Sequence, residues 1–163
     1  MTSPTRYFDD FAAGDRFELG SFRLTASEII EFARRYDPQP FHTDPEAATS
    51  SIFGGLIASG WQTGASVMRL MVDNFISTES GLGSPGMDEI RWIRPVRPGV
   101  DYSASITIEQ TKASASKPDR GVIWSLIELR DPDGEVVYTS RGMGMWRRAP
   151  SDEASAEEPT NPR

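Results

Sequence analysis

Residues 60–77 carry apolar side chains at helical spacing around most of the circumference of one expected helix. The polar positions of this segment form a single narrow stripe, which consists of Gln62, Ser66, Arg69 and Asp73. A helix that is apolar on most of its surface is normally surrounded by other structure. The segment therefore predicts a long helix at the centre of a domain, with the rest of the fold built around it.

After the glycine-rich residues 81–86, the apolar period changes to two, which is typical of half-buried strands. Strands are expected near residues 88–93, 102–109, 122–129 and 136–146, and an earlier one near residues 17–24. A turn is expected at residues 131–134, where the sequence reads Asp-Pro-Asp-Gly. The predicted fold class is α+β: an antiparallel sheet of about five strands that wraps around the long central helix.

The composition narrows the possible functions. The chain has 163 residues and no cysteine, which excludes disulfides, thiolate nucleophiles and zinc-thiolate or iron-sulfur sites. Its formal net charge of -7 argues against binding to nucleic acid or to an anionic membrane through bulk electrostatics. The first residues lack the apolar core of a signal peptide, and no segment approaches the ~20 apolar residues of a membrane span. We therefore expect a cytoplasmic protein without a membrane partner.

The length fits a single domain, and we expect this domain to cover residues 1–148. Residues 149–163 are rich in Pro, Ser, Ala and Glu and contain no large apolar side chain. Such a segment cannot offset the entropy lost on ordering. We predict that it forms a disordered acidic tail.

Two shorter helices are expected before the long one. Thr25 begins a Thr-Ala-Ser-Glu run with the spacing of a capping box. Pro38 should end the helix that follows, because the residue before a proline is disfavoured in the α region. This leaves Asp37 at the exit of the first helix. Asp44 and Pro45 have the pattern of an N-cap and a first helical residue, so they predict the start of the second helix.

His42 lies just before the second helix and is the only histidine of the chain. An imidazole is the side chain best suited to exchange protons at neutral pH. Asp37 precedes it by five residues, and Pro38 and Pro40 stiffen the connection between them. Such a segment can hold a carboxylate and an imidazole toward one water molecule. The spacing alone is equally compatible with a helix connector in which both side chains only hydrogen-bond backbone groups.

Three segments of the chain together resemble one known family. Residues 37–48 read DPQPFHTDPEAA, residues 53–60 read FGGLIASG, and residues 93–101 read IRPVRPGVD. They are similar to the hydratase motif and to a later Phe-x-x-Pro-Val-x-x-Gly-Asp motif of the MaoC-like dehydratase family, the (R)-specific enoyl-CoA hydratases. The resemblance extends over most of the chain up to about Arg148. It implies a hot-dog fold, in which an antiparallel sheet wraps a long helix, and a homodimer of two such units.

The resemblance also implies which residues form the site. Asp37 and His42 would be the catalytic acid/base pair, and the backbone N–H of Gly60 would bind the thioester carbonyl oxygen. The other residues expected to contact the substrate are Gln39, Phe41, Ser59 and Trp61. An N–H group at a helix start suits the oxyanion role, because it meets the charge that develops on the carbonyl oxygen without having to reorganise.

Four positions depart from the family pattern. Gln39 replaces the usual asparagine, and Ser59 stands where many members have histidine. Met68 occupies a position where some hydratases carry a pocket serine, and Trp61 is a large residue next to the expected oxyanion donor. These departures bear on substrate preference more than on the class of reaction.

The function predicted in this way is hydration of trans-2-enoyl thioesters to (R)-3-hydroxyacyl thioesters, or the reverse dehydration. In the hydration direction Asp37 would take a proton from water and His42 would give one to the α-carbon. Coenzyme A or acyl carrier protein would carry the substrate. No cofactor or metal is expected, because one histidine and scattered carboxylates make a poor ligand set. An acyl-CoA thioesterase and a non-catalytic acyl-thioester-binding subunit remain as alternatives, because one fold hosts several functions.

Overall fold

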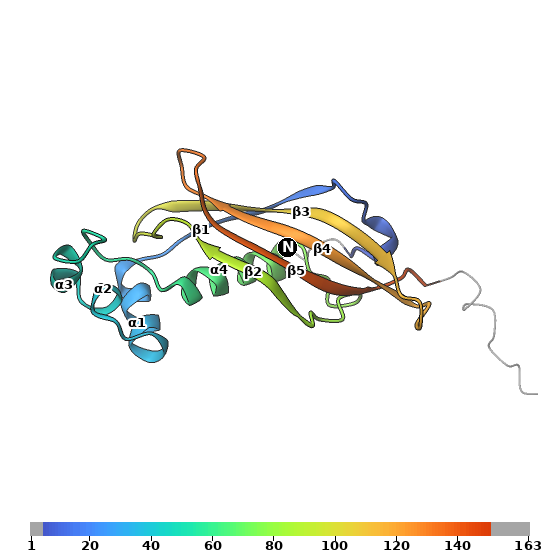
Figure 1. Cartoon of the computed structure of the whole chain (residues 1–163), viewed down its shortest axis with the longest axis horizontal. Helices are drawn as coiled ribbons and strands as arrows, with labels where there is room; N and C mark the ends of the chain where they lie inside the picture. The colour runs from blue at the N-terminus through green and yellow to red at the C-terminus, as the bar shows by residue number, and fades with distance from the viewer. Residues whose placement is uncertain (1–4, 151–163) are drawn as a thin grey trace, which may run out of the picture.

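The computed structural model of the chain describes residues 5–150. From residue 151 onward, the predicted acidic tail lies outside the described residues. The described residues form one antiparallel sheet, one long helix beneath it and a cluster of short helices at one end (Figure 1). No helix of this part of the chain is both long enough and apolar enough to cross a membrane.

Five strands form the sheet in the order β1-β3-β4-β5-β2. Their bounds are β1 (Arg16–Arg23), β2 (Gly86–Trp92), β3 (Asp101–Ala113), β4 (Arg120–Arg130) and β5 (Val136–Arg147). All neighbouring strands are antiparallel, with β3, β4 and β5 in the middle and β1 and β2 at the edges. All five expected strands are present, although β3 extends beyond the expected residue 109.

The predicted turn between β4 and β5 is present. Gly134 donates its backbone N–H to Asp131 O at 3.0 Å, and Glu135 N donates to the Asp131 carboxylate at 2.9 Å. Gly134 has a φ of +84°, which lies in the left-handed region where glycine is favoured. Asp131 and Gly134 thus fix the register of the two strands that follow each other here.

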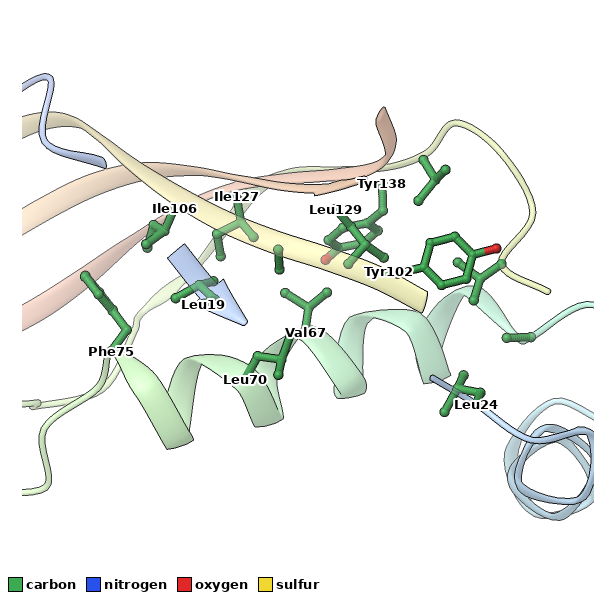
Figure 2. Close-up of a cluster of buried hydrophobic side chains, with 14 of the residues drawn as sticks. Leu19, Leu24, Val67, Leu70, Phe75, Tyr102, Ile106, Ile127, Leu129 and Tyr138 are labelled. Carbon is green, nitrogen blue, oxygen red and sulfur yellow. The ribbon is translucent and has the colours of Figure 1, made fainter. Parts of the chain in front are cut away.

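Helix α4 (Gly60–Asn74) lies under the side of the sheet that curves toward it (Figures 1 and 2). Its 15 residues give it a length of about 22 Å at 1.5 Å per residue. Val67 and Leu70 are buried on the sheet-facing side of α4. They pack in one core cluster with inward side chains of the strands, among them Leu19, Ile106, Ile127 and Leu129. The expected central helix wrapped by a sheet is confirmed.

Helix α4 ends three residues before the expected position. Phe75 leaves the helical conformation at φ -131°, and the N–H groups of Phe75 and Ile76 both donate to Met71 O. The Phe75 ring is 1% exposed and packs against the rings of Phe11 and Trp146. This aromatic anchor turns the chain toward the sheet, which a helical pattern in the sequence does not reveal.

The sheet covers only one side of α4. Away from Val67 and Leu70, Trp61 is 62% exposed, and Met68 and Val72 are each 48% exposed. The sequence predicted a helix surrounded on most of its circumference, and within residues 5–150 a single five-stranded sheet is too narrow to provide that cover. An apolar strip of α4 is left on the surface of the chain.

Three short helices lie beyond the N-terminal end of α4 (Figure 1). They are α1 (Ala26–Tyr36), α2 (Pro40–Thr43) and α3 (Pro45–Thr49). The capping box of α1 is confirmed: Thr25 Oγ1 accepts from Glu28 N at 3.2 Å, and the Glu28 carboxylate accepts from Thr25 N at 2.7 Å. The N-cap of α3 is also confirmed, because Asp44 Oδ1 accepts from the N–H of Glu46 at 2.9 Å.

Helix α2 was not predicted. The segment between Asp37 and His42 was expected to be a stiff connector, yet Pro40 begins one helical turn in which Asp44 N donates to Pro40 O at 2.9 Å. Proline is tolerated at the first helical position, since its missing N–H would have no partner there. His42 therefore sits within a helical turn and not in an extended loop.

Candidate active site

The carboxylate of Asp37 is held at the C-terminal end of α1, where its backbone N–H donates to Ala33 O at 2.8 Å. Gln39 Nε2 donates to Oδ1 and Ser59 Oγ donates to Oδ2, both at 2.7 Å. The Gln39 amide, with smaller effects from Ser59 and His42, lowers the pKa of Asp37 below its ordinary value, although partial burial opposes this. Asp37 is therefore an ionised acceptor at neutral pH.

The imidazole of His42 is oriented by a backbone carbonyl. His42 is 5% exposed, and its Nδ1 lies 2.8 Å from Ile57 O. Because a carbonyl oxygen can only accept, this contact assigns the hydrogen to Nδ1. Nε2 is then the ring atom that gains and loses the exchangeable proton.

The two side chains meet at their reactive atoms. Nε2 of His42 lies 3.4 Å from Oδ2 of Asp37. With a neutral imidazole, two acceptors face the same point and both can take a proton from water. With an imidazolium, Nε2–H can donate to the carboxylate or to a substrate atom. The role of proton donor expected for His42 therefore requires its charged form, whereas Asp37 is ready to act as a base.

Gly60 is the first residue of α4, and Ser59 is its N-cap, whose Oγ accepts from Trp61 N at 3.2 Å. Among the described residues the Gly60 N–H has no hydrogen-bond acceptor. An N–H at this place lies at the positive end of the helix dipole, so it is suited to bind an oxyanion. The glycine borders the same cavity as Asp37 and His42.

The backbone of Gly60 is covered closely by Trp92 of β2. The indole Nε1 of Trp92 donates to Gly60 O at 2.8 Å. A Cβ placed on Gly60 would lie 2.5 Å from two ring atoms of Trp92, and Gly60 does not have a positive φ. Space for the indole, and not an unusual backbone conformation, is therefore what requires glycine at this position.

A cavity of about 400 Å³ joins these groups, and we call it the catalytic cavity. Of the residues expected to contact the substrate, Gln39, Phe41 and Trp61 line it. Ser59 does not, because it is fully buried and its hydroxyl is bonded to Asp37. The structure thus brings the expected site residues together, with Ser59 beneath the site. Within residues 5–150, no three His, Asp or Glu side chains gather in a group that could hold a metal ion.

A second cavity, of about 380 Å³, was not predicted; we call it the apolar cavity. It lies between α4 and the inward face of the sheet, and Met68, Met71, Met87, Met143 and Met145 line it. Tyr138 also lines it, is 4% exposed, and points from β5 toward α4 (Figure 2). Burial raises the pKa of Tyr138, so its hydroxyl stays protonated. A sequence signal that indicates such a space is the alternating run of small residues Ser140, Gly142 and Gly144 in a strand.

These features define a class of protein: an α+β domain in which a curved antiparallel sheet covers a long helix, with a carboxylate, an imidazole and a helix N-terminus around one cavity. The MaoC like domain model matches residues 11–122 of the chain. The chain belongs to the MaoC-like dehydratase family, and its fold is the hot-dog fold that the sequence motifs implied.

Two curated proteins are similar to the chain in sequence, and the match covers very different shares of their lengths. The protein YdeM of Bacillus subtilis, whose function is uncharacterised, is 33% identical over 130 residues, which are 80% of this chain and 91% of that protein. Protein MaoC of Klebsiella aerogenes is 27% identical over 122 residues. These residues are 73% of this chain but 36% of protein MaoC, so the likeness concerns one part of that longer protein.

Solved structures agree with the family assignment. A MaoC-like dehydratase from Rhodospirillum rubrum is 38% identical, with a TM-score of 0.84, and the match covers 90% of this chain and all of that one. An R-hydratase from Pseudomonas aeruginosa is 18% identical, with a TM-score of 0.70 over 88% of this chain and 86% of its own. At this lower identity, the second likeness bears on the fold alone.

Proposed function

We propose that the protein is a hydratase/dehydratase that interconverts trans-2-enoyl thioesters and (R)-3-hydroxyacyl thioesters. The observation that supports this most directly is the 3.4 Å approach of Asp37 Oδ2 and His42 Nε2 in a cavity that Gly60 also lines. A base, a proton donor and an N–H at a helix N-terminus are the three groups that addition of water to an enoyl thioester requires.

In the proposed hydration, the thioester carbonyl oxygen accepts from the Gly60 N–H. Asp37 takes a proton from water as the oxygen of that water bonds to the β-carbon, and electron density moves onto the carbonyl oxygen. Protonated His42 then gives its Nε2 proton to the α-carbon. In the dehydration direction the same steps run in reverse, so His42 takes the proton from the α-carbon and Asp37 gives its proton to the leaving hydroxyl. The reaction moves only the elements of water, so these residues would suffice without a redox cofactor or a metal.

The test is turnover of crotonyl-CoA followed at the absorbance of the enoyl thioester. The proposal expects loss of this absorbance without release of free thiol, and formation of the (R)-3-hydroxy product on a chiral column. Thiol release would identify a thioesterase instead. Binding without turnover over a panel of enoyl thioesters would identify a non-catalytic subunit. Repeating the assay with the same acyl group on acyl carrier protein would establish which carrier is used.

We also propose a homodimer. Met68 and Val72 of α4 and Met87 of β2 are half exposed, as is Ile93 just after β2. Within the described residues, β2 pairs with β5 alone, so the other edge of this strand has no partner. A second copy placed there would cover apolar surface and close the open side of the apolar cavity. Light scattering of the purified chain tests this, since a monomer at micromolar concentration would contradict it.

A cytoplasmic location likewise stays a prediction, to be tested by cell fractionation.

A further inference from the structure

Three residues line both the catalytic cavity and the apolar cavity: Gly60, Trp61 and Trp92. The indole rings of Trp61 and Trp92 meet edge to face, with their centroids 5.4 Å apart. The two tryptophans therefore lie at the boundary between the space that holds Asp37 and His42 and the space between α4 and the sheet.

The two rings are held to very different degrees. Trp92 is fixed by the hydrogen bond from Nε1 to Gly60 O and by its close packing against the backbone of Gly60. Trp61 is 62% exposed in the single chain, and within residues 5–150 its indole N–H has no acceptor. Exposed side chains change rotamer within nanoseconds. Trp61 is thus the side of the boundary that can move, while Trp92 stays in place.

The apolar cavity behind this boundary is kept open by small residues. Ser125 of β4 and Ser140, Gly142 and Gly144 of β5 line it where larger side chains would fill a core. An unfilled apolar space destabilises a fold in proportion to its volume. The methionines around it adapt to ligands of different shape, because their side chains are unbranched and flexible. A space of this kind suits an apolar chain of variable length.

We propose that Trp61 is a specificity-determining residue that controls which acyl chains enter the apolar cavity. The inference rests on the proposed function, because the acyl chain has to begin beside Asp37 and His42. The carrier arm of a thioester is large and polar, so it leaves the catalytic cavity toward solvent. A short enoyl group then fits with Trp61 in its present position, whereas a long straight chain has to displace the indole to reach the space between α4 and the sheet.

The experiment compares kcat/KM for crotonyl-CoA and trans-2-decenoyl-CoA in the wild type and in Trp61→Ala. We expect the ratio of decenoyl to crotonyl kcat/KM to rise about tenfold or more, the size of effect that a change of pocket shape produces. Trp124→Ala is the matched control, since Trp124 lies on β4 and lines neither cavity. This control should leave the ratio unchanged.

A second variant tests the route of the chain. Ser140→Leu adds bulk inside the apolar cavity, so the double variant Trp61→Ala/Ser140→Leu should lose the gain for decenoyl-CoA. An equal change for both substrates in Trp61→Ala would overturn the proposal. So would a gain that Ser140→Leu does not affect, or a Trp61→Ala variant whose oligomeric state differs from that of the wild type by light scattering.

Binding of saturated thioesters separates this inference from the proposed reaction. Butyryl-CoA and decanoyl-CoA cannot be hydrated, so, once the thiol-release assay shows that they are not hydrolysed, calorimetry reports their Kd whether or not the protein is a hydratase. If the wild type turns over no enoyl thioester, the proposed function fails. A Kd for decanoyl-CoA that falls about tenfold in Trp61→Ala, with a smaller change for butyryl-CoA, would still support Trp61 as the residue that selects the acyl chain. Unchanged Kd values would overturn that role.

Discussion

Ser59 Oγ donates a hydrogen bond of 2.7 Å to Asp37 Oδ2. As the N-cap of α4, Ser59 Oγ also accepts a hydrogen bond from the N–H of Trp61. One buried hydroxyl thus connects the carboxylate at the end of α1 with the helix start that carries the Gly60 N–H. The expected base and the expected oxyanion donor come from segments more than 20 residues apart, since Ser59 follows Asp37 by 22. Their relative position depends on this contact.

Replacing Ser59 should change both the acidity of Asp37 and the stability of the fold. Ser59→Ala removes one of the hydrogen bonds that lower the pKa of Asp37, so this pKa should rise. Since Asp37 must be ionised to act as a base, the acid limb of the kcat/KM profile should move to higher pH. Loss of the N-cap should also lower the free energy of unfolding by about 1 kcal/mol, measured by urea titration.

Gln39→Ala is the matched comparison. Gln39 donates to the other carboxylate oxygen and makes the largest contribution to the lowered pKa of Asp37, but it lies on the surface and caps no helix with its side chain. The acid limb should again move to higher pH, while the free energy of unfolding stays close to that of the wild type. A profile that is unmoved in both variants would mean that Asp37 does not control this limb.

The roles of the pair are tested by Asp37→Asn and His42→Ala. Removal of a general acid or base lowers rates by about 100-fold to 10,000-fold, so kcat on crotonyl-CoA should fall by at least the lower figure in each variant. Circular dichroism and light scattering should match the wild type. Retention of wild-type kcat in both variants would remove the basis of the proposed mechanism.

Asp37 should also contribute to the pH dependence of stability. Its pKa is lower in the folded chain than the value of about 3.9 expected when unfolded. The stabilisation that follows is therefore complete above the unfolded pKa and is lost as pH falls through the folded pKa. Asp37→Asn should make the free energy of unfolding less dependent on pH in this acidic range. Urea titrations at several pH values measure this, and parallel curves for both proteins would contradict it.

Most of the fold could be predicted because it is determined by patterns among residues that are close in sequence. The alternating residues of the strands, the capping box at Thr25 and the Asp44-Pro45 helix start each depend on neighbours a few positions away. The end of α4 at Asn74 could not be predicted, because it depends on packing of Phe75 against distant rings. The apolar cavity could not be predicted for a similar reason, because small residues in one strand leave a space only when the helix opposite them is in place.

The same difference between local and distant contacts applies to the candidate site. Asp37 and His42 are close in sequence and could be named from the motif, and their reactive atoms do meet. The contact of His42 with Ile57 O spans 15 residues, and that of Trp92 with Gly60 O spans 32. No spacing rule leads to such partners, so the orientation of the imidazole and the reason for glycine at position 60 required the three-dimensional structure.

A glycine far from the site allows the packing of the N-terminal segment to be tested by itself. A Cβ on Gly121 would lie 2.2 Å from the ring of Phe8, which belongs to the short helix η1 (Phe8–Asp10). Gly121→Ala should therefore lower the free energy of unfolding by about 1–3 kcal/mol through overpacking. Phe8→Leu/Gly121→Ala should recover part of this loss in urea titration, and an additive loss would place the cause elsewhere.

The close packing of Trp92 on Gly60 leads to a prediction about stability. The effect of Gly60→Ala on the free energy of unfolding should depend on whether Trp92 is present. In the wild type, Gly60→Ala puts a methyl group 2.5 Å from the indole, so the ring must move and the hydrogen bond from Nε1 to Gly60 O is lost. The free energy of unfolding should fall by about 1–3 kcal/mol. In a Trp92→Ala background the space is free, and alanine is favoured over glycine in a helix by up to about 1 kcal/mol.

Gly60→Ala should thus destabilise the wild type but be neutral or stabilising in Trp92→Ala, as measured by a double-mutant cycle of urea titrations. The same cycle bears on the oxyanion site, because displacement of the Gly60 N–H by a shifted helix start would raise the barrier by about 3 kcal/mol. We therefore expect kcat on crotonyl-CoA to fall more in Gly60→Ala than in the double variant. An equal loss of stability in both backgrounds would mean that the backbone of Gly60, and not the indole of Trp92, requires glycine here.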